Sequence, residues 1–141
     1  MKVIVDTSVW ALALRRQAPV KSVHRTLLAE LVRDGRVVML GVIRQELLSG
    51  IRIADQYAKV RVHLRAFPDL VVKTEDHELA AEFFNACMAK GIQGNPTDFL
   101  ICAAADRNRQ AILTTDKDFV RYQRHVPVNL VPCSEGAGSG G

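Results

Sequence analysis

The sequence predicts an α/β domain whose mostly parallel central sheet, of four to five strands, is covered by helices on both faces in three layers. Short apolar segments with the length of strands alternate with amphipathic segments with the length of helices. No internal repeat or linker interrupts this alternation, and 141 residues suffice for a sizeable core. We therefore expect one domain over residues 1–132, followed by a flexible Gly/Ser-rich tail over residues 133–141.

Apolar runs, capping residues and chain breakers predict each element in turn. The apolar run over residues 2–5 stops at Asp6, which indicates a short buried strand. Thr7 or Ser8 can cap the next helix, which we expect to reach about Arg16. The other predicted strands are residues 37–40, 70–72, 111–113 and 130–131. The other predicted helices run from Val23 to the glycine at 35, and then over about 42–48, 55–67, 75–90, 96–107 and 118–124.

The cysteines and histidines form no pattern typical of a disulfide framework or a zinc site. Three cysteines are an odd number without a C-x-x-C spacing, and the four histidines are scattered. We therefore expect reduced thiols and a cytoplasmic protein. No apolar run approaches the roughly 20 residues of a membrane span. The run after Met1 is too short for a signal-peptide core.

The formal charge of +4 conceals a difference between the two halves of the chain. Residues 1–65 hold 12 Lys or Arg against 5 Asp or Glu, whereas residues 66–141 hold 7 against 10. A basic half favours a polyanionic partner such as a nucleic acid. The alternative is an ordinary solvated surface.

Four acidic residues stand at positions where apolar neighbours predict burial. Asp6 and Asp116 follow apolar strands, so they should lie at the carboxyl ends of the sheet, where open α/β folds bind ligands. Asp98 falls in the first turn of a helix that is apolar all round. Glu46 continues the apolar stripe of its own helix. A carboxylate buried in this way is costly unless it is paired or binds a metal.

Convergence of these four carboxylates at one edge of the sheet would require a cation, because they would otherwise repel each other. Oxygen-only clusters suit Mg²⁺, with Mn²⁺ as a further possibility. Each acid also has an ordinary explanation that needs no ligand. These are a helix cap for Asp6, a helix dipole for Asp98, a turn for Asp116 and an ion pair of Glu46 with Arg44 or Arg107. Without a metal, all four of these ordinary explanations would have to be true at once. We therefore favour a metal site.

The four acids lie in four short segments, in this order along the chain: Val-Ile-Val-Asp6-Thr7-Ser8-Val9-Trp10, Arg44-Gln45-Glu46-Leu47-Leu48-Ser49-Gly50, residues 96–105 around Asp98, and Thr114-Thr115-Asp116-Lys117-Asp118-Phe119. Together these segments resemble the motifs of the PIN-domain family, and in particular of VapC-type toxin ribonucleases. The likeness spans residues 1–132. Each segment alone is a weak signal, but four in the right order are specific.

The resemblance implies a PIN-like fold and a metal-dependent endoribonuclease. Asp6, Glu46, Asp98 and Asp116 would then be the catalytic residues and would hold Mg²⁺. The ion would polarise the phosphodiester and lower the pKa of the attacking water. The expected substrate is RNA.

Further residues are candidates for supporting roles. Ser8 and Thr114 offer hydroxyls that could hold carboxylates in place, with ordinary capping or turn hydrogen bonds as the alternative. Asp118 either supports the site or caps the helix that follows it. Arg15 and Arg44 are candidate contacts to RNA phosphates, although solvated side chains would explain them equally.

The resemblance also implies protein partners. These are a VapB-type antitoxin that inhibits the nuclease, a second copy in a homodimer, and a toxin–antitoxin hetero-oligomer. Apolar side chains near the first two helices could serve a dimer, with core packing as the alternative; they are Trp10, Leu12, Leu14 and Val20. The rival function is a catalytically inactive PIN-like module that only binds RNA or protein, and four intact acids speak against it.

Overall fold

The computed structural model describes residues 1–14 and 22–133, in which helices alternate with short strands. The strands are β1 (Val3–Val5), β2 (Val37–Val38) and β3 (Ala111–Leu113). The helices are α1 (Thr7–Leu14), α2 (Val23–Arg33), α3 (Gly41–Leu48), α4 (Ala54–Leu64), α5 (Thr74–Met88), α6 (Pro96–Arg107) and α7 (Asp118–Gln123). Four predicted features lie outside the described residues: the helix end at Arg16, the candidate RNA contact Arg15, the apolar Val20, and the tail from residue 134 onward.

The sheet is parallel throughout, with β1 in the centre of the order β2-β1-β3. Two isolated parallel bridges extend it, Met39 with Asp69 beside β2 and Ile112 with Leu130 beside β3. The strand predicted at 70–72 does not form, because the bridge falls at Asp69 just before it, and the strand predicted at 130–131 is reduced to the single bridge at Leu130. In the first of them, Val71 is 72% exposed, so the segment has no continuous apolar face that would extend the pairing.

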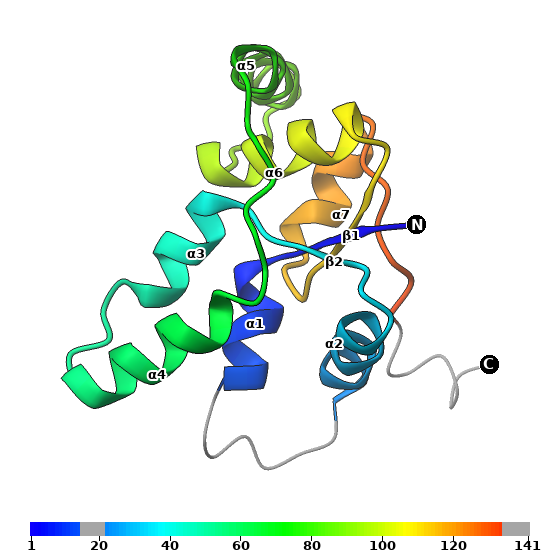
Figure 1. Ribbon diagram of the computed structural model, residues 1–141. Coiled ribbons are helices and arrows are strands. Elements are labelled where there is room, and N and C mark those ends of the chain that lie inside the picture. The colour runs from blue at the N-terminus through cyan, green and yellow to red at the C-terminus, as the bar shows by residue number, and fades with distance from the viewer. Residues whose placement is uncertain (15–21, 134–141) are drawn as a thin grey trace.

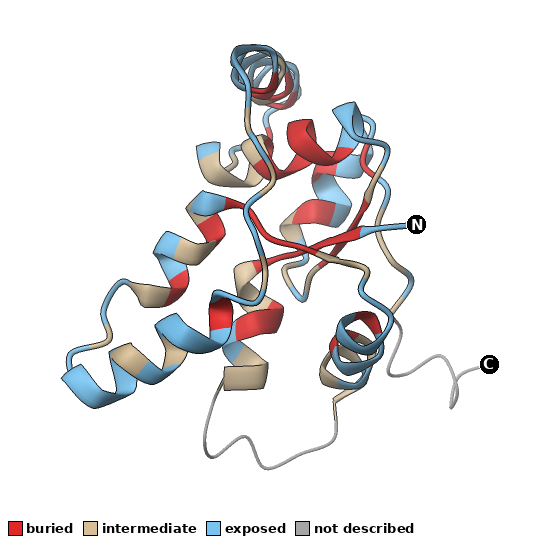
Figure 2. Cartoon of the chain, in the orientation of Figure 1, coloured by how far each residue is buried: buried red, intermediate tan, exposed pale blue. Residues whose placement is uncertain are grey.

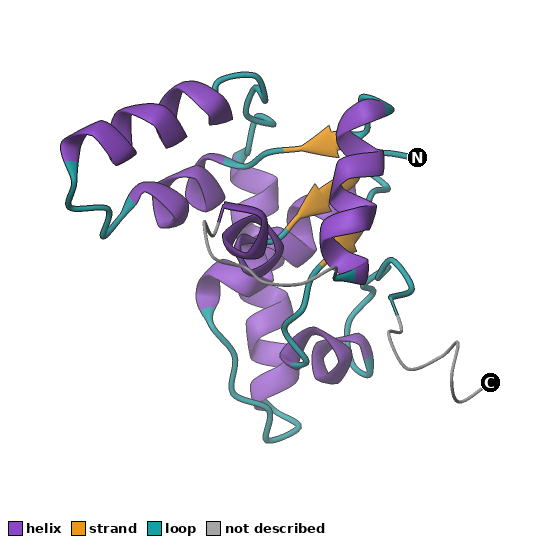
Figure 3. Ribbon diagram, turned by 90° about the horizontal axis from the view of Figure 1, so that it is seen from below, coloured by secondary structure: helices purple, strands orange, loops and turns teal. Residues whose placement is uncertain are grey.

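Helices cover both faces of this sheet. Figure 1 shows α5 and α6 on one side of the strands and α1 and α2 on the other. In Figure 3, turned by 90°, the three strands lie side by side among these helices. α6 contacts both β1 and β3, and α5 packs against α6 on the same side of the sheet. The predicted three-layer α/β/α architecture with a parallel sheet is thus confirmed.

The core surrounds the sheet, with α6 packed on one face and α1 and α2 on the other. All residues of β1 and β3 are buried, as Figure 2 shows. In α6, Phe99 and the segment 101–105 are also buried, which confirms the prediction of an interior helix. Trp10 is only 3% exposed and packs edge-on against Phe67 at 5.1 Å between ring centroids, so it belongs to the core. Leu12 and Leu14 are half-buried, and Val20 lies outside the described residues.

The predicted capping of α1 is wrong. Neither Thr7 nor Ser8 caps the helix with its side chain, because both hydroxyls donate to acidic side chains instead. The backbone carbonyl of Asp6 accepts from Val9 and Trp10 and so begins the helix. The first helical turn therefore points two hydroxyls at acids of the candidate site.

The start of α6 follows directly from its sequence. The side chain of Asn95 accepts a hydrogen bond of 2.9 Å from the backbone N–H of Thr97, and Pro96 occupies the first helical turn, where its missing N–H is tolerated. These two residues fix where the helix begins. Asp98 is thereby placed in the first turn, close to the positive end of the helix dipole.

None of the helices in residues 1–14 and 22–133 has both the length and the apolar character needed to cross a bilayer.

Candidate active site

Asp6 lies at the carboxyl end of the central strand and is the most buried acid of the candidate site, with 6% of its surface exposed. Its backbone N–H donates to the carbonyl of Leu113 at 2.9 Å, which joins the ends of β1 and β3. Carboxyl ends of parallel strands are where α/β folds bind ligands. The strand order therefore places Asp6 where the sequence predicts it.

Two hydroxyls hold the Asp6 carboxylate. Ser8 Oγ and Thr114 Oγ1 each donate to Asp6 Oδ2 at 2.8 Å, and the two hydroxyl oxygens lie 3.3 Å apart. Ser8 Oγ also accepts from the backbone N–H of Thr115 at 3.0 Å. Two chain segments, residues 6–8 and 114–115, thus meet at one carboxylate, and the hydroxyl of each segment donates to it.

The loop after β3 carries Asp116 in a series of local hydrogen bonds. The backbone N–H of Asp116 donates to Thr114 Oγ1 at 2.9 Å, and Asp116 Oδ1 accepts from the backbone N–H of Asp118 at 2.9 Å. Asp118 itself faces outward, with its side chain 49% exposed and 3.5 Å from Arg121. Asp118 therefore lies on the solvent side of the loop, while Asp116 lies half-buried beside Thr114.

Asp98 is held from a different element. The hydroxyl of Tyr122, on α7, donates to Asp98 Oδ2 at 2.9 Å. Tyr122 is fully buried, whereas Asp98 is half-buried. The contact ties the first turn of α6 to α7.

Glu46 departs from its predicted environment. It is exposed on α3 rather than buried in an apolar stripe, and its Oε1 accepts a 2.6 Å hydrogen bond from Thr7 Oγ1. The helix buries Ile43 and Leu47 instead, so its inward face turns away from Glu46. Thr7 nevertheless links Glu46 to the turn that follows Asp6.

Among the described residues, Glu46 forms no ion pair with Arg44 or Arg107, because each arginine pairs with another acid. Arg107 pairs with Asp76, and Arg44 pairs with Asp69. Arg44 donates to Asp69 Oδ1 from Nε at 3.1 Å and from Nη2 at 2.9 Å, and it also donates to the carbonyls of Leu64 and Phe67. This arginine therefore ties α3 to the end of α4 and the sheet edge. All three guanidinium nitrogens are occupied, which speaks against the predicted role of Arg44 in RNA binding.

The four acids share one electrostatic environment. The pKa of Asp98 is raised from 3.8 to about 6, chiefly by burial, with further contributions from the negative charges of Asp6, Asp116 and Glu46. The hydrogen bond from Tyr122 opposes this rise. Burial and the neighbouring negative charges therefore disfavour ionisation of Asp98.

The donor chemistry fits a hard divalent cation. Carboxylate oxygens held by hydroxyls are the ligands that Mg²⁺ and Mn²⁺ favour. A cation would also offset the negative charge that raises the pKa of Asp98. Within the described ranges, however, no three His, Cys, Asp or Glu side chains form a ready-made cage. Glu46 is held by Thr7 of α1 and Asp98 by Tyr122 of α7, so these two carboxylates are positioned by different helices.

Two residues of this network were missed by sequence reasoning. Tyr122 contacts Asp98 across 24 positions of the chain, and Thr7 contacts Glu46 across 39. The apolar spacing of their helices carries no information on such pairs. The available signal was chemical, because a buried tyrosine hydroxyl requires a hydrogen-bond partner.

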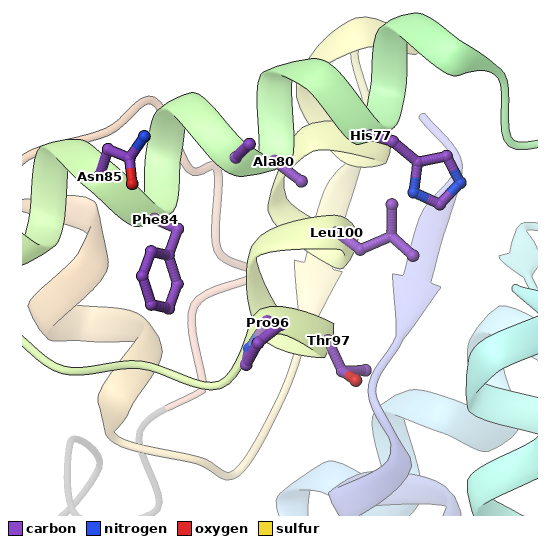
Figure 4. Close-up of a pocket in the computed structure, with 8 residues that line it drawn as sticks. His77, Ala80, Phe84, Asn85, Pro96, Thr97 and Leu100 are labelled. Carbon is purple, nitrogen blue, oxygen red and sulfur yellow. The ribbon is translucent and has the colours of Figure 1, made fainter.

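A groove of about 450 Å³ lies beside α6, the helix that carries Asp98, but it is separate from the four acids. It lies between α5 and α6 and is shown in Figure 4. His77 and Phe84 line it from α5, and Thr97 and Leu100 line it from α6. None of the four acids lines it, although Thr97 is the chain neighbour of Asp98. The groove is therefore a separate, mostly apolar surface feature.

With this geometry in view, comparison with known proteins identifies the family. The PIN domain profile matches residues 3–125, and the chain therefore belongs to the PIN domain family. The comparison with curated proteins found no match.

Several solved toxin–antitoxin structures share the fold. A chain of VapBC2 from Rickettsia felis, bound to a DNA fragment from its promoter, is 17% identical with a TM-score of 0.74, covering 93% of this chain and 98% of that chain. FitAcB from Neisseria gonorrhoeae is 17% identical with a TM-score of 0.74, covering 92% and 96%. VapBC-5 from Mycobacterium tuberculosis is 19% identical with a TM-score of 0.67, covering 93% and 98%.

Proposed function

We propose that this chain is the nuclease of a VapC-type toxin–antitoxin pair, a Mg²⁺-dependent endoribonuclease that cuts RNA phosphodiester bonds. The observation that carries the proposal is the meeting of acids from separate elements. Thr7, Ser8 and Thr114 hydrogen-bond to Glu46, Asp6 and Asp116 at the carboxyl end of the sheet, and the negative charges of these three acids contribute to the raised pKa of Asp98. Membership of the PIN domain family and the fold shared with the VapBC2 and FitAcB chains support it.

Asp6, Asp98 and Asp116 would hold the divalent ion, with Glu46 as a further ligand or as the residue that orients the attacking water. When bound, the ion supplies a water of lowered pKa and polarises the phosphodiester. The four acids repel additional anions, so the cation is also needed for the phosphate to approach. This requirement predicts that RNA binds productively only in its presence.

The contribution of this chain's hydroxyls is orientation. Ser8 and Thr114 both donate to Oδ2 of Asp6, which fixes the plane of that carboxylate. Within the described part of the chain, Oδ1 of Asp6 receives no hydrogen bond, and Asp6 would therefore be able to hold the ion through this oxygen. Losses of about 10- to 100-fold are typical when such supporting groups are removed from metal sites.

The charge distribution supports RNA as the substrate. Once the four acids are assigned to the site, the rest of the chain has 19 Lys or Arg and 11 acidic residues. Such an excess favours phosphate backbones. Because Arg44 is committed to Asp69, the phosphate contacts must come from other cations, and Arg15 stays a prediction.

The partners are proposed from the same likeness. The similar structures are complexes of a toxin with its antitoxin, and we infer that a VapB-type antitoxin inhibits this chain in the cytoplasm. We also infer a homodimer. Light scattering of the purified chain should give twice the mass of 15.6 kDa, and a monomer at all concentrations would contradict the dimer.

The experiment that tests the function is cleavage of a panel of structured RNAs in Mg²⁺, in Mn²⁺ and in EDTA. Wild-type protein should cut with either ion and stop in EDTA, whereas Asp6→Asn should be inactive. Asp55→Asn, which changes an exposed acid of α4, is the matched control and should cut at the wild-type rate. Cleavage in EDTA, or by Asp6→Asn, would contradict the proposal. RNA binding without cleavage in any ion would favour the inactive module.

The toxin role is tested separately in cells. Expression should arrest growth, and Asp98→Asn or a co-expressed antitoxin should relieve the arrest. Arrest that persists with Asp98→Asn would show that toxicity does not depend on the acids.

A further inference from the structure

We propose that Tyr122 is a positioning residue of the metal site, which orients the Asp98 carboxylate for the divalent ion through its buried hydroxyl. The inference rests on the proposed function, since it presumes that Asp98 binds the ion. It assigns a role to a side chain outside the four acids and their local hydroxyls.

The hydroxyl of Tyr122 has a single side-chain partner among the described residues. It donates to Asp98 Oδ2 at 2.9 Å, and Tyr122 is 0% exposed, so water does not compete for this hydrogen bond. A donor on Oδ2 leaves Oδ1 of Asp98 as the oxygen directed to other ligands. Asp6 shows the same division, with both of its hydroxyl donors on Oδ2.

Aromatic packing holds the Tyr122 ring in one place. Its centroid lies 4.5 Å from that of Phe99 and 5.4 Å from that of Phe119. Phe99 in turn packs edge-on against Phe84 at 5.7 Å. The ring therefore cannot swing without disturbing neighbours on α5, α6 and α7, so its hydroxyl is a fixed donor.

The loop before α6 is shaped around these rings. A Cβ added to Gly94 would lie 2.4 Å from Cε2 of Phe99 and 2.9 Å from Cε1 of Tyr122, which is too close for any other residue. The backbone at Gly94 therefore packs directly against the rings of Phe99 and Tyr122. Asp98 follows four residues later, so the loop that positions the tyrosine also positions the acid.

A buried tyrosine that only satisfies its hydroxyl would explain the hydrogen bond but would have no effect on metal binding. The two roles are separated by measuring the ion itself. Tyr122→Phe removes one oxygen and keeps the ring packing. Tyr57→Phe is the matched control, because Tyr57 is the other tyrosine of the chain and lies exposed on α4.

The experiment is a titration of the RNA-free protein with Mn²⁺, followed by electron paramagnetic resonance, with thermal unfolding in EDTA measured alongside. Tyr122→Phe should bind Mn²⁺ about 10-fold more weakly than wild type, as is typical when a group supporting a ligand is lost. Tyr57→Phe should bind like wild type. Equal Mn²⁺ affinity of Tyr122→Phe and wild type would overturn the inference.

Asp98→Asn separates this inference from the proposed function. If wild type binds Mn²⁺ and Asp98→Asn does not, the metal site stands, and Tyr122→Phe alone decides the role of the tyrosine. If wild type binds no Mn²⁺, both the proposed metal mechanism and the inference fail.

A second measurement decides the matter should Tyr122→Phe fail to fold. In Tyr57→Phe, Tyr122 is the single remaining tyrosine. Mg²⁺ should then produce a tyrosine difference spectrum in the near ultraviolet, because ion binding at Asp98 changes the hydrogen bond from Tyr122. Asp98→Asn in the same background should abolish it. A spectrum unchanged by Mg²⁺ would contradict the inference.

Discussion

The surroundings of Asp98 would suit a metal ligand, but they destabilise the protein when no metal is bound. Burial and three neighbouring carboxylates raise its pKa to about 6, so ionisation is unfavourable in the folded chain. A group with a raised folded pKa binds its proton more tightly when folded. The penalty is therefore absent below the unfolded value of 3.8, grows as the pH rises towards 6, and is complete above that.

Asp98→Asn should consequently stabilise the metal-free protein. The neutral amide avoids the ionisation penalty, which we place at about 1–2 kcal/mol at pH 7 because solvent screens this half-buried site. Thermal unfolding in EDTA between pH 4 and pH 8 measures it, and the difference from wild type should shrink as the pH approaches about 4. A variant less stable than wild type at pH 7 would contradict the environment assigned to Asp98.

The hydroxyl of Thr114 gives a second test at this scale. Thr114→Val removes the donor to Asp6 at nearly constant volume and should slow RNA cleavage by about 10- to 100-fold. Thr114→Ser keeps the hydroxyl and should restore most of the rate. Thr115→Val is the control, since only the backbone N–H of Thr115 enters the network. Identical rates for Thr114→Val and Thr115→Val would remove Thr114 from the site.

Sequence reasoning located the acids better than their surroundings. The places of Asp6, Asp98 and Asp116 in the fold could be predicted because strand ends and first helical turns are local features. Glu46 was placed on the wrong face of α3, since the apolar stripe of that short helix follows Ile43 and Leu47. Tyr122 could not be paired with Asp98, because nothing in the chain between them encodes the approach of α7 to α6.

At the scale of elements, α5 and α6 are joined by an acid that sequence reasoning did not single out. Asp76 is 2% exposed; its Oδ1 accepts from Arg107 Nε at 2.7 Å and its Oδ2 accepts from the backbone N–H of Lys73 at 2.8 Å. It is thus as buried as Asp6, yet it is fully paired. Burial of an acid therefore does not by itself mark an active site.

Breaking this pair should destabilise the fold. Arg107→Ala leaves the Asp76 carboxylate buried with one donor, so the free energy of unfolding should fall by about 1–3 kcal/mol. Urea denaturation measures the change. Lys90→Ala, an exposed cation near the end of the same helix pair, should change stability by less than about 0.5 kcal/mol. Equal effects of the two variants would show that the ion pair contributes nothing.

Helix boundaries were predictable where chemistry marks them. Asn95 and Pro96 define the start of α6, and the strand Ala111–Leu113 has the predicted limits. The helix expected over 55–67 ends at Leu64 instead, because Arg44 binds the carbonyls of Leu64 and Phe67 and so stabilises a non-helical exit. Such a long-range contact leaves no local signal in the sequence.

At the scale of the whole molecule, charge separates an acidic centre from a basic remainder. The formal charge of +4 becomes +8 when Asp6, Glu46, Asp98 and Asp116 are set aside, since 19 Lys or Arg then face 11 acids. At the two edges of the sheet, the short apolar runs led to an overprediction of strands, because each edge pairing consists of a single bridge.

Salt should therefore weaken RNA binding in a graded way. With wild-type protein in Mg²⁺ and a single-stranded RNA analogue that cannot be cleaved, the logarithm of the affinity should fall linearly with the logarithm of the salt concentration, by about 0.7 for each phosphate neutralised. Fluorescence anisotropy over a range of KCl concentrations measures this slope. An affinity independent of salt would show that the basic excess does not serve RNA.

The central claim is that acids from separate elements form one metal centre. Its most direct test is a crystal of the wild-type protein soaked in Mn²⁺ and measured at the manganese absorption edge. We expect an anomalous peak within bonding distance of Asp6 and of Asp98 or Asp116, and no such peak in Asp6→Asn crystals. Ordered side chains with no peak at this sheet edge, or a peak that persists in Asp6→Asn, would contradict the account.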